Sequence, residues 1–304
     1  MENKILVTGG YGLVGSEFNK PNFIPLSSSE ADLRIREDVN HIFKTIKFDG
    51  VIHCAGKVGG LGGNMNNKGQ FFYDNIMINT NVIESARVNG IKNLVSFLST
   101  CIFPDNIEYP LTESKIHLGP PHFSNDAYAY AKRMADIQIR SYREQYGLNY
   151  KSVIPTNIYG FNDNYNIENG HVIPSLIHKC YLARENKTDF EIWGTGKPLR
   201  EFIFSSDVAK LTEWVLENYN ESEPIILSTS EEISIKEVVD IIVELMNFKG
   251  KVKWNTDKPD GQFRKPSDNS KIKRYLPDFK FTPLYDGLKE TIEYFQNNYS
   301  FIRK

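Results

Sequence analysis

The sequence predicts an α/β protein with a Rossmann-type, doubly wound parallel sheet and a smaller C-terminal α/β substrate domain. Short apolar segments alternate with helical patterns from residue 1 to about 160. A glycine-rich segment follows the first apolar segment directly. Beyond Gly160 the alternation stops, and Asn, Asp and Gly are frequent in residues 161–170. Alternating strands and helices form a parallel sheet that is covered on both faces.

The elements of the first domain follow from local patterns, taken in chain order. The expected strands are short apolar runs at residues 4–7, 23–26, 51–55, 94–98 and 152–155. The expected helices, which have apolar residues at three- and four-residue spacing, are 12–19, 38–47, 75–89 and 128–145. Gly90 and Gly147 stand at the ends of the last two helices, where glycine often ends a helix.

The second half of the chain is expected to return once to the first domain. Residues 225–228 (Ile-Ile-Leu-Ser) are expected to form its last strand, and residues 285–297 a final helix of the second domain. The predicted dinucleotide-binding domain therefore comprises residues 1–160 and about 201–230. The predicted second domain comprises about 161–200 and 231–304.

Composition excludes several classes of protein. The 304 residues include 36 Lys and Arg against 38 Asp and Glu, so the net charge of -2 gives no general attraction to nucleic acid or anionic lipid. No stretch approaches the roughly 20 apolar residues of a membrane helix. The first residues run directly into a strand-like segment, without the basic and apolar regions of a secretory signal.

Cysteine and histidine spacing gives no metal site. Cys54, Cys101 and Cys180 are far apart, and no CxxC pair predicts a disulfide framework or zinc site. The six histidines form no HxxxH or similar ligand spacing, so a metal hydrolase is disfavoured. A reducing cytoplasm is the expected location.

The segment Thr8 to Gly15 is the candidate dinucleotide-binding turn. Its glycines are three residues apart, and it stands between an expected strand and an expected helix. Glycine is needed there because side chains would keep a pyrophosphate from the backbone amides at the helix N-terminus. The predicted cofactor-binding residues of this turn are Gly9, Gly12, Leu13, Val14 and Gly15.

The end of the second strand favours NADPH. An acid there would bind the ribose 2′-hydroxyl of NAD, but Ser27 and Ser28 stand there and no acid occurs before Glu30. Hydroxyl groups can bind a 2′-phosphate, which a carboxylate would repel. A simple serine turn is the alternative, and Arg34 and Arg36 are near only in sequence.

Asp32 and Leu33 come just beyond the second strand. An aspartate at this point can accept a hydrogen bond from the adenine amino group. A structural aspartate in a turn explains the same spacing equally well, so both interpretations stay open.

Tyr128 and Lys132 are a candidate catalytic pair, because residues at i and i+4 share one face of a helix. The ammonium is expected to lower the pKa of the phenol, which then serves as a general acid or base. A YxxxK spacing also occurs by chance on solvated helices. Tyr130 is two residues from Lys132 and is expected to point elsewhere.

Ser99 follows the strand at residues 94–98, at the sheet edge where open α/β sheets bind ligands. Its hydroxyl can hydrogen-bond a substrate oxygen beside Tyr128. The glycine triplet, this serine and the Tyr–Lys pair, in that order, are typical of extended short-chain dehydrogenase/reductases. The roles of Cys101 and His171 stay open. Cys101 is either catalytic or a small buried residue, and His171 is either catalytic or a structural histidine.

Segments throughout the chain resemble the GDP-L-fucose synthase family, the GDP-4-keto-6-deoxymannose 3,5-epimerase-4-reductases. The similar segments are residues 55–61, 99–104, 120–122, 128–133, 155–157, 170–179, 192–196, 200–202 and 260–265. They are far more specific than a glycine triplet. The resemblance implies a homodimer.

The resemblance implies a role for each site residue. Cys101 would remove the C3 and C5 protons of a GDP-linked 4-keto sugar, and His171 would reprotonate these carbons. NADPH would then reduce C4, with Tyr128 protonating O4, Lys132 tuning Tyr128 and Ser99 orienting the ketone. The implied substrate-binding residues are Asn157, Lys179, Trp193, Arg200 and Lys265, and Ala55, Asn157 and His171 would also contact the cofactor.

Two segments depart from the family and leave alternatives open. Gly160 to Asn164 reads Gly-Phe-Asn-Asp-Asn where relatives usually read Gly-Pro-His-Asp-Asn, and Gly62 and Gly63 stand where relatives often have bulkier residues. The alternatives are a C4 reductase without epimerisation, acting on a sugar such as GDP-4-keto-6-deoxyheptose, or a non-catalytic NADP-binding sensor. The presence of Ser99, Tyr128 and Lys132 disfavours the sensor.

Overall fold

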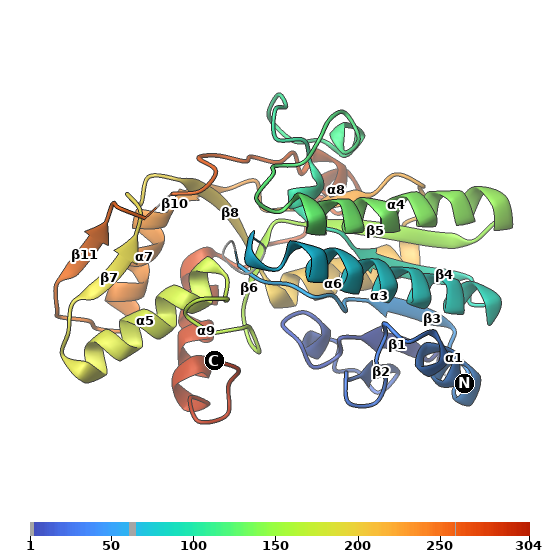
Figure 1. Cartoon of the computed structure of the whole chain (residues 1–304), viewed down its shortest axis with the longest axis horizontal. Coiled ribbons are helices and arrows are strands. Elements are labelled where there is room, and N and C mark those ends of the chain that lie inside the picture. Colours follow the sequence, from blue (N-terminus) through green and yellow to red (C-terminus); the bar gives the residue numbers. More distant parts are fainter. Residues whose placement is uncertain (1–2, 61–64, 259) are drawn as a thin grey trace.

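A six-stranded, entirely parallel sheet forms the centre of the larger part of the molecule (Figure 1). The structure is a computed structural model that describes residues 3–60, 65–258 and 260–304. Along the sheet the strand order is β2-β1-β3-β4-β5-β9. The strands are β1 (Ile5–Thr8), β2 (Phe23–Leu26), β3 (Gly50–His53), β4 (Asn93–Phe97), β5 (Asn149–Pro155) and β9 (Ile225–Leu227). The predicted parallel sheet is confirmed.

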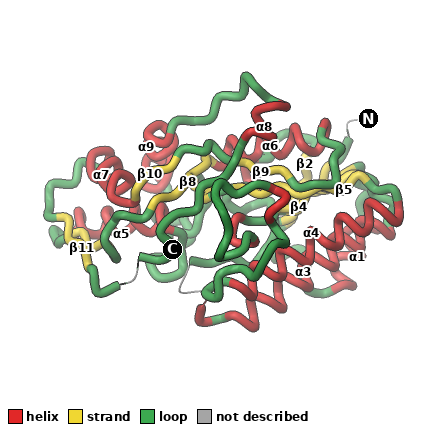
Figure 2. Tube along the Cα trace, turned by 90° about the horizontal axis from the view of Figure 1, so that it is seen from above, coloured by secondary structure: helices red, strands yellow, loops and turns green. Residues whose placement is uncertain are grey.

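Helices cover both faces of this sheet (Figure 2). One face carries α1 (Arg36–Thr45), α3 (Lys68–Val88) and α4 (Asp126–Tyr146). The other carries α6 (Ser205–Asn218) and α8 (Ser270–Tyr275). A separate cluster of buried apolar residues lies between each face of the sheet and its helices. Burial of these residues holds the strands, and therefore their carboxyl ends, in place.

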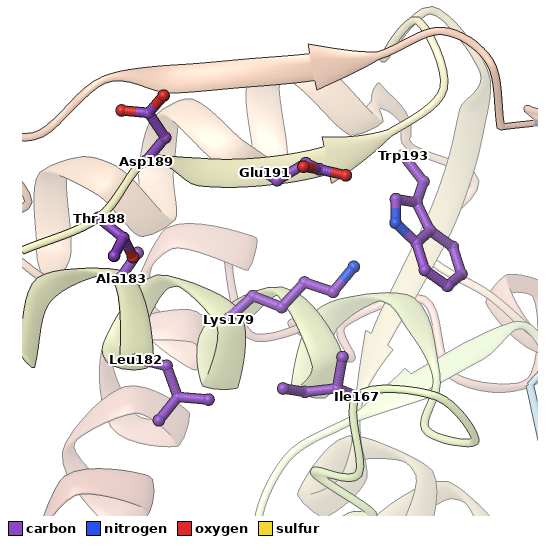
Figure 3. Close-up of a pocket in the computed structure, with 8 residues that line it drawn as sticks. All are labelled: Ile167, Lys179, Leu182, Ala183, Thr188, Asp189, Glu191 and Trp193. Atoms are coloured by element: carbon purple, nitrogen blue, oxygen red, sulfur yellow. The ribbon is translucent and has the colours of Figure 1, made fainter. Parts of the chain in front are cut away.

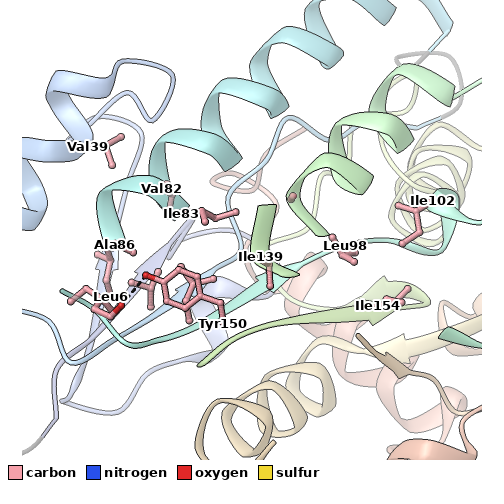
Figure 4. Packing of buried hydrophobic residues seen from close by; sticks show 14 of the residues in the cluster. Leu6, Val39, Val82, Ile83, Ala86, Leu98, Ile102, Ile139, Tyr150 and Ile154 are labelled. Atoms are coloured by element: carbon pink, nitrogen blue, oxygen red, sulfur yellow. Dashed lines mark hydrogen bonds between the residues drawn. The ribbon is translucent and has the colours of Figure 1, made fainter. Parts of the chain in front are cut away.

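The core beneath α3 and α4 shows why these helices form where they do (Figure 4). Val82, Ile83 and Ala86 of α3 have no exposed surface, and Ile139 of α4 packs in the same cluster. Tyr150 of β5 is buried among them, and its hydroxyl donates a 2.8 Å hydrogen bond to the Ile91 carbonyl oxygen. The phenol thus lies in an apolar core without an unpaired hydroxyl.

The helix expected at residues 12–19 is wrong. The chain forms only a short 3-10 helix there, Gly15–Glu17. Pro21 cannot continue a helix, and the ring of Phe18 packs 5.4 Å from that of Phe23 at the start of β2. The chain therefore turns into the second strand after one helical turn.

The other expected helices form, with shifted ends. Helix α1 begins two residues before the expected 38, and α3 begins at Lys68 instead of 75. Helix α4 and the positions of Gly90 and Gly147 agree with the sequence patterns. No described helix is both long and apolar enough to span a membrane.

Within the described residues, a smaller part contains two short sheets and the helices α5, α7 and α9 (Figure 1). Its three-stranded sheet has the order β10-β8-β6, and a second sheet pairs β11 with β7. The elements are β6 (Asn157–Tyr159), α5 (Val172–Asn186), β7 (Phe190–Trp193), β8 (Leu199–Phe204), β10 (Glu232–Ser234), α7 (Ile235–Leu245), β11 (Val252–Asn255) and α9 (Leu284–Asn297). The expected helix at 285–297 is confirmed, whereas the two-domain boundaries stay a prediction.

Candidate active site

A cavity of about 730 Å³ opens at the carboxyl ends of the sheet strands. Its walls include the turn after β1, the ends of β2 and β3, and the start of the segment after β4. The predicted cofactor-binding residues all line it: Gly9, Gly12, Leu13, Val14, Gly15, Ser27, Ser28, Asp32, Leu33, Ala55, Tyr128, Lys132, Asn157 and His171. The fold therefore gathers these predicted residues, which extend from Gly9 to His171 along the chain, in one cavity.

The glycine-rich turn packs so closely that several of its positions, Gly9 and Gly15 among them, leave no room for a side chain. Gly9 has a φ of 67°, and a Cβ there would lie 3.0 Å from the Ala55 backbone nitrogen. A Cβ on Gly15 would lie 2.1 Å from the Gly9 carbonyl oxygen. Close backbone packing thus exposes main chain, without side chains, to the cavity, which fits the pyrophosphate of a dinucleotide.

Ser27, at the end of the sheet strand β2, is hydrogen-bonded to the carboxylate of Glu30, three residues later. The Glu30 carboxylate accepts hydrogen bonds from the Ser27 backbone N–H at 2.8 Å and from its hydroxyl at 2.6 Å. These bonds lower the pKa of Glu30. Ser28 lines the cavity without this partner.

Arg34, which the sequence placed near the second strand only along the chain, lines this cavity. Its guanidinium contacts the Asp32 carboxylate at 2.6 Å and the buried Asp74 carboxylate at 3.2 Å. All three side chains line the cavity. No sequence signal identifies this cluster, because Asp74 belongs to α3 and is 40 residues away from Arg34. The Asp32 carboxylate, predicted to accept a hydrogen bond from the adenine amino group, therefore already accepts hydrogen bonds from Arg34.

Tyr128 and Lys132 lie one turn apart on α4 and are both buried. The Lys132 ammonium lies 5.9 Å from the centroid of the Tyr128 ring. It donates a 2.8 Å hydrogen bond to the Phe97 carbonyl oxygen at the end of β4. Tyr130 is 41% exposed, so it points away from the pair, as predicted.

The expected lowering of the pKa of Tyr128 is wrong for this structure. Burial is the main influence and raises the pKa of the phenol well above its usual range, with the neighbouring Cys101 adding to the effect. Burial also lowers the pKa of Lys132 to about 8. Removing both groups from water disfavours the charged form of each. The phenol is consequently a proton donor at neutral pH.

Ser99 and Cys101 belong to one short turn after β4. Ser99 caps the 3-10 helix Thr100–Ile102, and its Oγ accepts a 3.4 Å hydrogen bond from the Cys101 backbone N–H. Ser99 lines the cavity, while Cys101 is not among the described residues that do. Burial raises the pKa of the Cys101 thiol, and Ser99 and the positive charge of Lys265 oppose that shift.

His171 reaches the cavity from the start of α5, where it is the N-cap residue. Asp163 lines the same cavity, is only 3% exposed, and accepts a 2.6 Å hydrogen bond from the Asn164 N–H through Oδ1. Its Oδ2 has no hydrogen-bond partner among the described residues. Burial raises the pKa of Asp163, and the charge of His171 opposes that shift. Gly62 and Gly63, the other departing segment, lie outside the described residues.

Lys179 and Trp193 line a second cavity, of about 250 Å³, between α5 and β7 (Figure 3). The Lys179 ammonium lies 4.2 Å from the centroid of the indole ring. Lys258 lies 5.4 Å from the same centroid. The indole is 49% exposed, so a ring with two cations at its face remains open to solvent.

Arg200 and Lys265 line neither of these two cavities. The buried Glu201, next to Arg200 on β8, accepts hydrogen bonds from the N–H and hydroxyl of Ser267. This anchor holds the segment that carries Lys265. Burial lowers the pKa of Lys265, whose charge neighbours include Cys101 and Arg200. Lys265 is thereby close to both the Cys101 turn and Arg200.

The described residues include no group of three or more His, Cys, Asp or Glu that could hold a metal ion.

This geometry defines the class of the protein. The family model of the NAD dependent epimerase/dehydratase family matches residues 5–228, and the chain belongs to that family. Within it, a GDP-L-fucose synthase of Dictyostelium discoideum is 50% identical over 99% of this chain and 97% of its own length. The expected resemblance to GDP-L-fucose synthases is confirmed.

Solved structures support the same conclusion. A GDP-L-fucose synthetase from Naegleria fowleri bound to NADP has a TM-score of 0.95 and 43% identity, covering 100% of this chain and 97% of its own. A GDP-mannoheptose C4 reductase from Campylobacter jejuni with NADP bound has a TM-score of 0.85 and 29% identity, covering 97% and 99% of the two chains.

Proposed function

We propose that this protein is an NADPH-dependent enzyme that reduces the C4 ketone of a GDP-4-keto-6-deoxy sugar and also inverts C3 and C5, as a GDP-L-fucose synthase does. One observation carries the proposal. Ser99, Tyr128 and Lys132 lie on the wall of the same cavity as the glycine-rich turn, so a carbonyl beside the phenol would also be beside a bound nicotinamide.

NADP(H) fits the large cavity. The turn from Gly9 to Gly15 exposes its backbone there, and Ser27, Ser28 and Arg34 stand at the end of β2. When bound, NADPH supplies the hydride for C4. Arg34 gives a 2′-phosphate a guanidinium within the cavity, and its pKa is raised by Asp32 and Asp74, so it stays charged.

Tyr128 donates a proton to the C4 oxygen during reduction. Its raised pKa keeps the phenol protonated at neutral pH, which suits a donor. The Ser99 hydroxyl orients the ketone oxygen toward it. Lys132, fixed by the Phe97 carbonyl oxygen, holds positive charge near the phenol and stabilises the phenolate left after the transfer.

Cys101 removes the protons at C3 and C5, which the C4 ketone acidifies, and His171 returns protons to these carbons. A thiolate is needed for the first task, but burial raises the pKa of Cys101. Ser99 and the cations Lys132 and Lys265 lower that pKa again. Lys265 is therefore placed to support proton removal as well as to bind the diphosphate.

The GDP group binds in the smaller part of the molecule. Trp193 offers an exposed ring face for the base or sugar, with Lys179 beside it. Arg200 and Lys265 supply further positive charge for the two phosphates. Asn157, on the wall of the large cavity, is in place to contact both substrate and cofactor.

A C4 reductase that does not epimerise is the second candidate. In the segment Gly160 to Asn164 the two residues that depart from the family, Phe161 and Asn162, directly precede Asp163, which lines the cavity together with the proposed acid His171. The similarity to a heptose C4 reductase is consistent with this alternative. A non-catalytic sensor is disfavoured, because Ser99, Tyr128 and Lys132 are brought together.

We further propose a homodimer formed through α3 and α4. Tyr130, Met134 and Ile137 of α4 are between 39% and 47% exposed, and their spacing puts them on one helical face. Phe72 and Tyr73 are exposed on the neighbouring α3. A cytoplasmic location remains our prediction, supported by three unpaired cysteines.

The assay that tests this function uses GDP-4-keto-6-deoxymannose and NADPH in deuterated water. NADPH oxidation with deuterium at C3 and C5 of the product supports the coupled reaction. A reduced product without deuterium selects the second candidate. Absence of NADPH oxidation with this sugar and with GDP-4-keto heptoses would reject both.

A further inference from the structure

The segment after α9, residues 298–304, returns to the large cavity and brings Arg303 to its wall. The Arg303 carbonyl oxygen accepts a 2.9 Å hydrogen bond from the Tyr165 N–H. Tyr165 is fully buried, and its ring centroid lies 4.9 Å from that of Phe295 in α9. The backbone at Arg303 is therefore anchored to the core of the smaller part.

The loop that anchors Arg303 also contacts the glycine-rich turn. The Asn162 amide donates a 3.1 Å hydrogen bond to the Ser16 hydroxyl, directly after Gly15. Its other amide atom, Oδ1, accepts a 2.6 Å hydrogen bond from the Tyr294 hydroxyl of α9. The loop from Asn162 to Tyr165 thus connects the region of Arg303 to the turn that is proposed to bind a pyrophosphate.

The charges around the cavity leave Arg303 available to a ligand. Arg34, which is proposed to bind the 2′-phosphate, is held by two carboxylates, and Lys132 is bonded to a carbonyl oxygen. Among the described residues the Arg303 guanidinium makes no hydrogen bond and no ion pair within 4 Å, and its positive charge acts on the nearby Asp163, whose pKa burial raises and Arg303 lowers. Asp163 lines the same wall, with its Oδ2 buried and unpartnered. An anion bound beside this carboxylate needs a cation that offsets their repulsion.

We propose that Arg303 binds the pyrophosphate of the dinucleotide, together with the backbone amides of the glycine-rich turn. This inference rests on the proposed cofactor. A guanidinium suits the task because its planar set of N–H donors matches two phosphate oxygens. Sequence patterns give no indication of this role, since Arg303 is 288 residues from Gly15.

The test measures NADPH binding to the whole protein by the fluorescence of the nicotinamide. Arg303→Ala keeps the backbone oxygen that Tyr165 binds and removes only the side chain. We expect its Kd for NADPH to rise about fivefold, the size of one exposed ion pair. The difference from the wild type should shrink as salt is raised. Arg303→Lys should recover part of the affinity.

Lys304→Ala is the matched control. It removes the same charge one residue away, but Lys304 is bonded to the Tyr299 carbonyl oxygen and does not line the cavity. Its Kd for NADPH should equal that of the wild type. An Arg303→Ala variant that melts normally and binds NADPH like the wild type overturns the inference.

A second titration, with GDP alone, separates the two possible sources of the phosphate. Unchanged GDP affinity in Arg303→Ala, with weakened NADPH binding, supports the dinucleotide. Weakened GDP binding with normal NADPH binding overturns the inference in favour of the sugar nucleotide. If the wild type itself does not bind NADPH, the proposed cofactor is wrong, which is a different result from a failure of Arg303 alone.

Discussion

The Lys132 ammonium is hydrogen-bonded to the Phe97 carbonyl oxygen at 2.8 Å and lies 5.9 Å from the Tyr128 ring centroid. The helix α4 thus presents its lysine to the end of β4, with the ammonium near the face of the phenol ring. Because both groups are buried, the lysine has a pKa of about 8 and the phenol remains protonated. This arrangement ties the proposed reduction to the protonation state of Lys132.

The rate of the proposed C4 reduction should fall as the pH rises through about 8. The pKa of Lys132 is lowered from its ordinary value, so the charged form is present below about 8 and is lost above it. Measuring kcat/KM for NADPH oxidation against pH should show a decline in that region. Lys132→Arg, which stays charged, should flatten the decline. An identical decline in this variant would assign it to another group.

Tyr128→Phe should lower kcat by about 10² to 10⁴, because it removes the proton donor to the C4 oxygen. The Kd for NADPH, measured by fluorescence, should change little. Tyr146→Phe is the control, since Tyr146 is also on α4 but is exposed and does not line the cavity. Similar rates for the two variants would mean that some other group protonates O4.

Cys101→Ser should keep reduction but stop inversion, because a hydroxyl is a far weaker base than a thiolate at the same place. The readout is deuterium at C3 and C5, together with product stereochemistry by NMR. Cys54→Ser changes a cysteine on the cavity wall and should leave both steps intact. Normal deuterium incorporation in Cys101→Ser would remove this residue from the mechanism.

Met134→Glu should convert a dimer into a monomer. It places a charge in the middle of the exposed apolar face of α4, where a partner subunit would bury it without a counter-ion. Size-exclusion chromatography with light scattering gives the mass. Lys289→Glu on α9 is the control and should not change it. A wild-type protein that is monomeric at high concentration contradicts the proposed dimer.

Acid should destabilise the protein partly through His53. The ring is fully buried; its Nδ1 lies 2.7 Å from the Thr8 hydroxyl oxygen and its Nε2 3.1 Å from Asn79 Oδ1. Burial lowers the pKa of His53 from 6.5 to about 3, so between these values the unfolded chain binds the extra proton and stability falls as pH falls.

Urea unfolding at pH 7 and pH 5 measures this contribution. The free energy of unfolding should drop by about 2 kcal/mol from His53 alone over this interval. His53→Gln, although less stable at pH 7, should show a correspondingly smaller drop. His41→Gln, at an exposed position of α1, should behave as the wild type. An equal drop in His53→Gln and the wild type would show that other groups cause the acid sensitivity.

Local patterns predicted much of the fold and part of the site. Two features were recognisable from the sequence: the turn from Gly9 to Gly15 and the spacing of Tyr128 and Lys132. Both depend on patterns of only a few consecutive residues. The helix at residues 12–19 was overestimated for the same reason. Its end depends on Pro21, and also on the packing of Phe18 against Phe23, which periodicity does not describe.

The sequence by itself determined the parallel α/β architecture, the dinucleotide turn, and Ser99, Tyr128 and Lys132 as site residues. Each of these features is recognisable from a local pattern of strand, turn or helix. Only the tertiary structure decided that Arg34 pairs with Asp74, that Arg303 joins the cavity, and in which direction the pKa of Tyr128 shifts. These features depend on which distant segments pack together and on how much water their packing excludes. Local sequence does not contain that information, because desolvation and long-range pairing arise only when the whole chain has folded.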